Sequence, residues 1–425
     1  MNIAKKLVAV LAAVAGLSAT PQAGAEILGA KGTNFIFTAK AGTVSTADGN
    51  SVPMWGFALD GGAPQYPGPT LILNQGDTVS IRLDNTLPMP VSMVFPGQEG
   101  VAASGGSEGV LAREAPPGGS VTYSFTVTRP GTFTYHSGTR PDLQIEMGLA
   151  GAMVVRPGGY DEATNRIAHD HPDSRFDREY LLVLSEMDPN IHQLAAQGRF
   201  DDIRTTGYFP VYWFLNGRTA PDTLAQANVG WLPHQPYNAL PRMHPGERLL
   251  MRVVNIGRQS HPFHHHGNHA LTLARDGQLL SSGPGAGADL ATLDFTIQAV
   301  PGQTHDAIFE WTGKGLGWDI YGHTADEPCL IEHGEDCSVH GKGVPVTMPA
   351  VTEMALGAHF SGSPFLGGSE AVPPGEGGMN ANGGLYFMWH SHNEKEMTNF
   401  DIFPGGMMTM VIIEPPGVVI DGSPH

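Results

Sequence analysis

The sequence predicts an all-β protein built from two Greek-key β-sandwich units, the second carrying a long loop insertion. Three observations support this fold class. The chain has 425 residues with 56 Gly, 34 Pro and only 15% charged residues, a composition that disfavours helical bundles. Short runs with period-two alternation are separated by Gly and Pro. One turn-and-strand pattern occurs twice. The length is sufficient for two or three separate cores.

The first unit is expected over residues 26–157. Asp77–Leu83 alternates polar with apolar side chains, which is typical of a half-buried strand. Pro and Gly cluster between such runs, as at Pro67-Gly68-Pro69, and this spacing predicts an antiparallel sandwich. The other expected strands are 70–73, 120–128, 132–135 and 151–155.

A polar linker is expected over residues 158–179, followed by the second unit over 180–420. Gln75-Gly76-Asp77 and Pro245-Gly246-Glu247 each lead into an alternating strand, which suggests a duplicated sandwich. Residues 324–384 are rich in Gly, Pro and Ser and predict a long surface loop. The best helix candidate starts at Asp188-Pro189 and ends at Gln197, because an acidic N-cap followed by Pro favours a helix start.

Residues 1–25 have the layout of a secretory signal. Lys5 and Lys6 precede an apolar run from Leu7 to Leu17, and the segment ends Ala23-Gly24-Ala25. The run is short for a membrane span, although a retained anchor is the alternative. We therefore expect a periplasmic or secreted protein with no membrane span, in a compartment where a disulfide can persist.

Charge and cysteine content exclude several function classes. Asp and Glu number 41 against 23 Lys and Arg, a formal net charge of -18, so nucleic acid is not an expected partner. Two cysteines are too few for a four-thiolate iron–sulfur or zinc site. The 19 histidines are the remaining source of metal chemistry.

Two histidine-rich segments carry the functional prediction. His264 and His266 lie in one segment and His390 and His392 in the other. Because strand residues i and i+2 point to the same face, each pair presents two imidazoles together. Two such pairs on neighbouring strands would give four nitrogen donors, which suit copper or zinc. The alternative is that each pair is a polar surface patch.

These residues resemble the cupredoxin-fold multicopper oxidases in a two-domain form. The family segment His-Pro-x-His-x-His-Gly is matched from His261 to Gly267, and its last segment, His-Cys-His, is matched in part at His390-Ser391-His392. Tyr135-His136-Ser137 is similar to a first-domain ligand segment, also in the trimeric copper nitrite reductases. The resemblance implies copper, adds His136 and His261 as candidate ligands, and leaves a homotrimer open.

Departures from the family motif predict an unusual mechanism. The position of the type 1 copper thiolate is Ser391, the next family histidine falls on Glu396, and the axial Met falls on Asp401. A hydroxyl cannot replace a thiolate as a soft, electron-conducting ligand. We therefore expect no conventional type 1 copper. Electrons would come directly from a small-molecule or metal-ion substrate or from a donor protein. The alternatives are a copper-binding or copper-storage protein without turnover and a structural module.

Cys329 and Cys337 lie within the expected loop. An exported protein favours a disulfide between them, worth roughly 2–3 kcal/mol on the loop-entropy model. The alternative is a second metal site in which both thiolates join His323, His333 and His340, a donor set that suits zinc or Cu(I).

Overall fold

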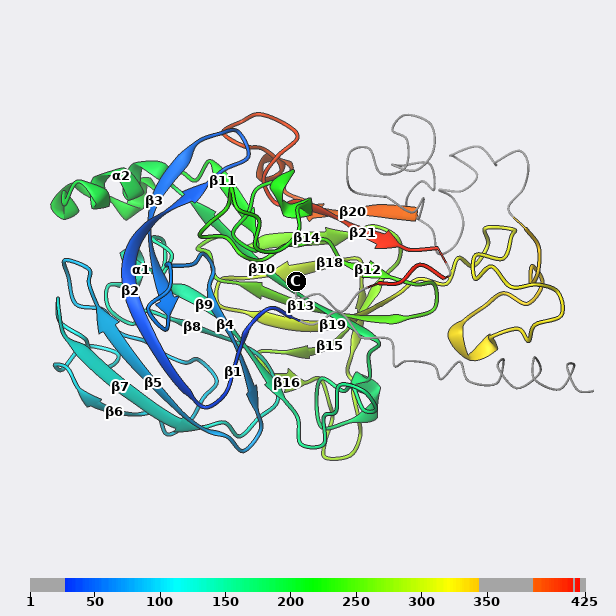
Figure 1. Cartoon of the computed structure of the whole chain (residues 1–425). Coiled ribbons are helices and arrows are strands. Elements are labelled where there is room, and N and C mark those ends of the chain that lie inside the picture. The colour runs from blue at the N-terminus through cyan, green and yellow to red at the C-terminus, as the bar shows by residue number, and fades with distance from the viewer. Residues whose placement is uncertain (1–26, 344–384, 416, 421–425) are drawn as a thin grey trace, which may run out of the picture.

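A computed structural model describes residues 27–343, 385–415 and 417–420. Strands dominate it and helices are few, so the prediction of an all-β fold is confirmed (Figure 1). The expected secretory signal and residues 344–384 of the expected loop lie outside the described residues. In the described part of the chain, no helix has the length and apolar character needed to cross a bilayer.

The five strands expected in the first unit are present with bounds that differ by a few residues. The first part of the chain contains β1 (Ala30–Lys31), β2 (Asn34–Ser45), β3 (Ser51–Leu59), β4 (Gly68–Asn74), β5 (Thr78–Asn85), β6 (Ala102–Gly105), β7 (Ser120–Thr126), β8 (Gly131–His136), α1 (Pro141–Gln144) and β9 (Ala150–Arg156). Of these, β1, β2, β3 and β6 were not predicted. The second part contains β10 (Arg178–Met187), α2 (Pro189–Ala196), β11 (Tyr212–Leu215), β12 (Arg242–Met243), β13 (Arg248–Asn255), β14 (His261–His265), β15 (Ala270–Arg275), β16 (Gln278–Leu279), β17 (Thr292–Asp294), β18 (Thr296–Ala299), β19 (Thr304–Glu310), β20 (Leu385–Ser391) and β21 (Met408–Ile413).

The N-terminal strands form two sheets, with orders β1-β4-β9-β8 and β3-β2-β5-β7-β6. Their inner faces share one core, in which the Phe37 ring contacts those of Phe57 and Tyr135 at 5.9 and 5.8 Å between centroids. Burying an aromatic side chain of this size contributes roughly 1.5–3 kcal/mol. In β5 alternate residues are fully buried, as the sequence pattern requires.

The C-terminal strands form a second pair of sheets. The larger has the order β11-β10-β13-β19-β15-β16, with β17 paired to β15, and the smaller has the order β12-β21-β20-β14-β18. Their shared core includes Trp389, whose ring lies 5.2 Å from that of Phe309. The histidine segments belong to the smaller sheet, because β14 and β20 are neighbours in it.

The repeated turn motif has the same setting in both pairs of sheets. Gly76 and Gly246 adopt positive φ, 94° and 78°, which glycine tolerates without strain. Each turn leads into a strand that pairs with one parallel and one antiparallel neighbour: β5 with β2 and β7, β13 with β10 and β19. The expectation of purely antiparallel sheets is therefore wrong, because long connections bring parallel strands together. The exact boundaries of the two units stay a prediction.

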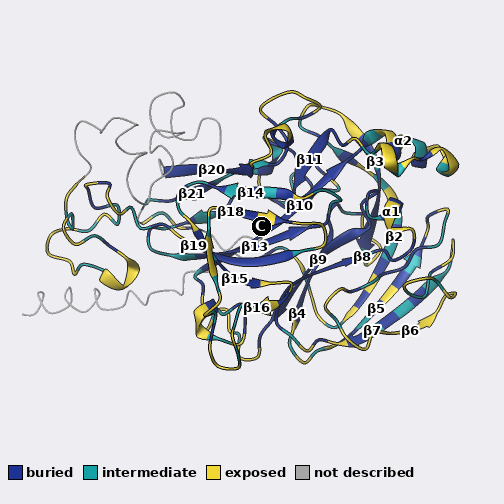
Figure 2. Ribbon diagram, turned by 180° about the vertical axis from the view of Figure 1, so that it is seen from behind, coloured by how far each residue is buried: buried dark blue, intermediate teal, exposed yellow. Residues whose placement is uncertain are grey.

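Buried segments of the N-terminal and C-terminal sheets lie side by side (Figure 2), and their side chains share one hydrophobic cluster. Arg252 on β13 lies between Glu179 on β10 and Asp306 on β19, donating at 2.9 and 3.3 Å, and it also donates to Thr132 on β8 at 3.0 Å. Arg156 on β9 donates to Glu179 at 2.8 Å. These charged groups are shielded from water. Each would destabilise the fold if it were buried without its oppositely charged partner.

The segment between the two pairs of sheets packs against the C-terminal sheets. Ala168 and Phe176, within the expected linker, are buried against Leu250 and Leu273 of the C-terminal sheets. Helix α2 has the predicted start, since the Asp188 carboxylate accepts the Asn190 backbone N–H at 2.9 Å. Short 3-10 turns lie at Pro172–Ser174, Phe200–Asp202, Thr205–Gly207, Asp222–Leu224, Ile331–His333 and Glu394–Met397.

Candidate metal centre

Strand register brings the two histidine segments together. β14 and β20 are antiparallel neighbours, and His264 lies directly opposite His390. His266 follows the end of β14 and His392 follows the end of β20. Each ring nevertheless lies beside that of the histidine two residues earlier, 4.7 Å between the centroids of His264 and His266 and 5.6 Å between those of His390 and His392. The sequence pattern predicted this common face, but the pairing of the two strands comes only from the fold.

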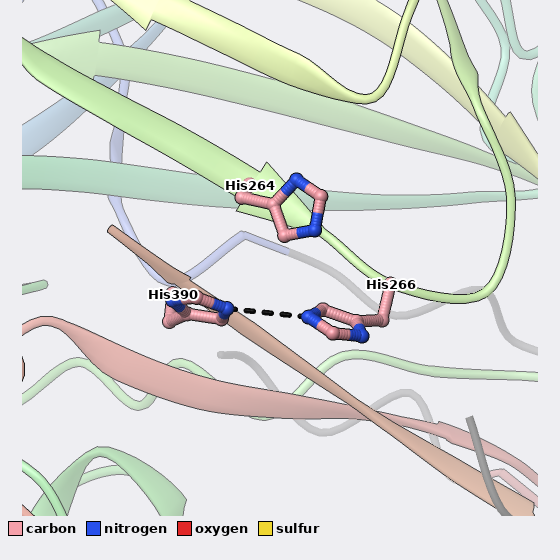
Figure 3. A group of neighbouring side chains, drawn as sticks. All are labelled: His264, His266 and His390. Carbon is pink, nitrogen blue, oxygen red and sulfur yellow. Dashed lines mark hydrogen bonds between the residues drawn. The ribbon is translucent and has the colours of Figure 1, made fainter. Parts of the chain in front are cut away.

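Three imidazoles meet at this face (Figure 3). One nitrogen from each of His264, His266 and His390 lies within 4.8 Å of the others, and Nε2 of His266 is 3.2 Å from Nε2 of His390. The ring of His392 lies at the edge, 4.9 Å from that of His264 between centroids. His392 is half exposed and its Nδ1 is 3.2 Å from a Glu394 carboxylate oxygen.

Neighbouring groups orient two of these rings. Nδ1 of His390 donates to the Ser391 carbonyl at 2.7 Å, which leaves its Nε2 with a lone pair. Nδ1 of His264 is 2.9 Å from the Thr296 hydroxyl. Burial and the three neighbouring imidazoles lower the pKa of His264 to about 4, and burial also lowers the pKa of His390. Both rings are therefore neutral near pH 7, the form that binds metal ions.

His261 lies apart from this group, contrary to the expectation that it is a further ligand. It is fully buried, and its two ring nitrogens each lie 2.8 Å from a carboxylate, Nε2 from Glu186 and Nδ1 from Glu396. Burial alone would lower the pKa of His261, but the two carboxylates raise it to about 9. His261 is thus an imidazolium with no lone pair for a metal.

The residues at the expected type 1 copper position also make contacts within the protein. Ser391 is fully buried, and its hydroxyl accepts the Asn393 backbone N–H at 3.2 Å. Glu396 holds His261 and accepts a hydrogen bond from the Asn393 side chain at 2.9 Å. Met407, which could match the axial methionine of the family only across an insertion, is buried in the hydrophobic core. Glu186 was not anticipated from the sequence, because it is 75 residues from its histidine partner.

His136 occupies a different place. It ends β8 and lines a cavity of about 240 Å³ together with Asn255 and Pro301. Its Nδ1 donates to the Ser137 carbonyl at 3.0 Å, and burial lowers its pKa. In the described part of this chain, His136 is not among the groups of three or more side chains close enough to share an ion.

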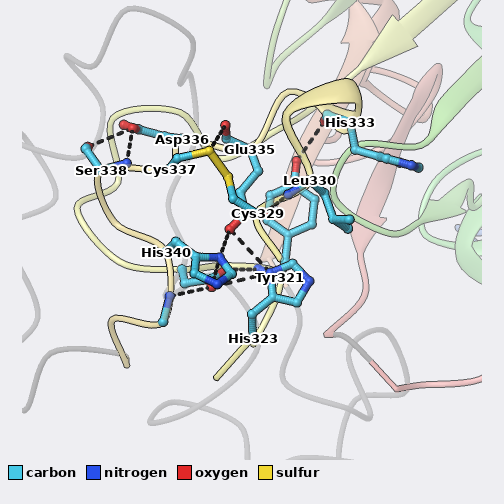
Figure 4. Close-up of a disulfide and its surroundings, with 12 residues drawn as sticks. Tyr321, His323, Cys329, Leu330, His333, Glu335, Asp336, Cys337, Ser338 and His340 are labelled. Carbon is cyan, nitrogen blue, oxygen red and sulfur yellow. Dashed lines mark hydrogen bonds and ion pairs between the residues drawn. A yellow bond between two sulfur atoms is a disulfide. The ribbon is translucent and has the colours of Figure 1, made fainter. Parts of the chain in front are cut away.

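Cys329 and Cys337 form a disulfide (Figure 4). Their thiolates are therefore not available to join His323, His333 and His340 around a metal, and that alternative is wrong for the disulfide-bonded chain. The side chain of His333 also points away from those of His323 and His340.

Comparisons with known proteins agree with this arrangement of strands. Residues 38–159 match the family described as multicopper oxidase. Over these residues the chain is similar to multicopper oxidases. An iron transport multicopper oxidase of Epichloe festucae is 32% identical over 196 residues, covering 45% of this chain and 27% of the relative. The L-ascorbate oxidase of Cucurbita maxima is 38% identical over 158 residues, covering 36% of this chain and 25% of the relative.

Solved structures show the same multicopper oxidase fold. The blue copper oxidase from Nitrosomonas europaea superposes with a TM-score of 0.55 at 17% identity, covering 90% of this chain and 86% of that chain. The multicopper oxidase mgLAC has a TM-score of 0.57 at 19% identity, covering 93% and 89%. The chain spans about a quarter of the length of these two curated relatives. Copper is the cofactor of this family.

Proposed function

We propose that this multicopper oxidase relative is an exported, copper-dependent oxidoreductase that holds copper through His264, His266 and His390, with His392 at the edge of the site. The observation that carries the proposal is the convergence of three imidazole nitrogens within 4.8 Å. The leader-like pattern of residues 1–25 supports export.

The donor set fits copper. All three ligands are imidazoles, and imidazole is a preferred ligand of copper. A first-row ion such as zinc lies about 2.0–2.1 Å from each imidazole nitrogen, so two nitrogens on one ion are ~3–3.5 Å apart. The 3.2 Å between the His266 and His390 nitrogens agrees with that spacing. Thr296 and the Ser391 carbonyl would keep two rings oriented.

Copper, when bound, supplies a one-electron redox centre beside solvent. The protein positions the ligands and controls access. His392 is half exposed, and the ring of Phe295, which is 55% exposed, lies 5.6 Å from that of His264 between centroids. A small aromatic substrate or a metal ion could thus approach the centre directly, and a donor protein could dock over the same edge.

His136 would contribute only from another copy of the chain, since it is outside the histidine group within one chain. The trimeric copper nitrite reductases, which the sequence resembles, place copper between subunits. We propose a homotrimer in which His136 faces the histidines of the next subunit. Analytical ultracentrifugation of the full-length protein with and without copper tests it, and a trimeric mass is the expected result.

A copper-binding or copper-storage protein without turnover is the second candidate. It is favoured by the serines at both positions where relatives carry a thiolate. Ser137 is buried and its hydroxyl donates to the Gln144 side chain at 2.6 Å, and Ser391 is buried as well. A chain with neither thiolate lacks the usual entry point for electrons.

Two measurements separate these functions. First, the metal-free full-length protein is loaded with copper and its copper content is measured for the parent and for His264→Ala/His390→Ala. The variant should lose most of the copper, whereas His269→Ala, an exposed histidine of the same segment, should retain it. Equal copper in parent and double variant would contradict the site. Second, dioxygen consumption with a phenol, Fe²⁺ or Cu(I) distinguishes an oxidase, which consumes it, from a storage protein, which does not.

A further inference from the structure

A second group of metal-binding side chains lies in the loop after β19, in the part of the chain next to the disulfide (Figure 4). Asp319, His323, Glu335 and His340 each direct one potential ligand atom to a common point, and these four atoms lie within 4.8 Å of one another. Both carboxylates are almost completely buried, with side chains 1% exposed, while the imidazoles are 16% and 12% exposed. The described loop contains a single short 3-10 turn and no strand.

We propose that these four residues form a binding site for a divalent transition-metal ion such as Zn²⁺, separate from the histidine centre on β14 and β20. The site would hold two nitrogen and two oxygen donors. It would tie residues 319–323 to residues 335–340 and so stabilise a loop with little regular structure.

The distances between the donor atoms match a tetrahedral ion. Nδ1 of His323 is 3.3 Å from Glu335 Oε1 and 3.5 Å from Asp319 Oδ2, and Nδ1 of His340 is 2.5 and 3.7 Å from the same two oxygens. Ligands about 2.0–2.2 Å from a zinc ion at tetrahedral angles are ~3.4 Å apart. Three of the four separations already have that value, and only the His340–Glu335 pair must widen.

Surrounding groups hold the donors in place, as outer partners do in metal sites. Nε2 of His340 donates to the Glu327 carbonyl at 2.7 Å, so in the neutral ring Nδ1 carries the lone pair. The Tyr321 ring is stacked on His323, 5.7 Å away and 7° from parallel. Backbone N–H groups of Leu330 and Gly341 bind Glu335 Oε2 and Asp319 Oδ2 at 2.5 and 2.9 Å.

Charge and access also favour a cation. Two buried carboxylates carry two negative charges, and one divalent ion neutralises both. The ion pairs that the described structure gives these two carboxylates are with His323 and His340. His323 also lines an open cavity of about 390 Å³ together with His244 and Val419, which provides a route from solvent. The disulfide keeps the thiolates out of the donor set, so a mixed imidazole–carboxylate site remains.

The test uses a full-length His264→Ala/His266→Ala/His390→Ala background, so that its outcome is independent of the proposed copper centre. Isothermal titration calorimetry with Zn²⁺ should give a stoichiometry of one bound ion per chain. Glu335→Gln should weaken that binding well over tenfold, since even outer partners of a metal are worth 10–100-fold. His333→Ala, in the same loop but directed away from the group, should bind as the background does.

Circular dichroism and a thiol assay establish that each variant is folded and disulfide-bonded. If Glu335→Gln fails to fold, His323→Gln replaces it, because that ring is at the rim of the group. A folded background that takes up no Zn²⁺ would show that the four residues are an ion-pair network only and would overturn the proposal. Equal Zn²⁺ affinity in background and variant would overturn it as well.

Discussion

The buried contact of His261 with Glu186 and Glu396 predicts a specific pH dependence of stability. The two carboxylates overcome the effect of burial and raise the pKa of His261 to about 9, against 6.5 in the unfolded chain. A group with a raised folded-state pKa stabilises the fold fully below its unfolded pKa, and this contribution is lost as pH rises through the folded pKa. The shift corresponds to about 3 kcal/mol, lost between roughly pH 6.5 and 9.

The assay is urea unfolding of the metal-free protein at several pH values across this window, followed by tryptophan fluorescence. Trp213, Trp311 and Trp389 are buried in the core of the C-terminal sheets and report on this region. Glu396→Gln keeps the shape and the contact but removes one carboxylate. We expect this variant to lose about half of the pH-dependent change, because Glu186 remains.

Glu394→Gln is the matched control. Glu394 is exposed, is paired with His392 and is two residues from Glu396, so its variant should show the same slope as the parent. Other histidines titrate equally in all three proteins and cancel in the comparison. Identical slopes for the parent and Glu396→Gln would refute the assignment of His261 as a buried imidazolium.

Three further predictions follow from the described contacts. Ser391→Cys alone should give no intense blue thiolate-to-copper absorption in the copper-loaded protein, because His261 stays bound to its carboxylates; such a band would contradict this. Arg252→Met should lower the free energy of unfolding by about 1–3 kcal/mol in urea titrations, since buried Glu179 and Asp306 each lose one partner and keep Arg156 and His169. Arg82→Met, in an exposed pair, should cost less than about 1 kcal/mol. Replacing both cysteines by serine should destabilise the loop by about 2–3 kcal/mol, visible as faster hydrogen exchange of residues 318–343.

Much of the fold was predictable because local patterns determine it. The alternation in β5 assigns its inner and outer faces, and Asp188-Pro189 determines the start of α2. The mixed sheets were not predictable from the same patterns. Period-two alternation identifies a strand without identifying its neighbours, so the parallel pairing of β10 with β13 depends on long connections that local sequence does not specify.

The candidate metal centre was likewise predictable in part, where local sequence decides, and not where distant segments meet. Strand parity placed His264 with His266 and left His265 on the opposite face, where it is fully buried and its Nε2 donates to the Asp294 carbonyl at 3.1 Å. Parity could not show that Glu186 reaches His261. The second metal-binding group was missed in part for a related reason: the sequence drew attention to histidines and cysteines, whereas Asp319 and Glu335 are ordinary acids until the loop folds around them.

The departures at positions 391 and 396 compensate for each other. In the family that this chain resembles, copper would bind His261 and a thiolate at position 391. With serine there, a buried His261 would keep an unsatisfied nitrogen, which costs about 1–3 kcal/mol. Glu396 supplies the missing partner for Nδ1. Both ring nitrogens of His261 are therefore satisfied without metal. The proposed metal chemistry is confined to the opposite face of β14, where His264 is a neutral donor. If copper binds there as proposed, electrons would enter it from the solvent side, next to the half-exposed His392.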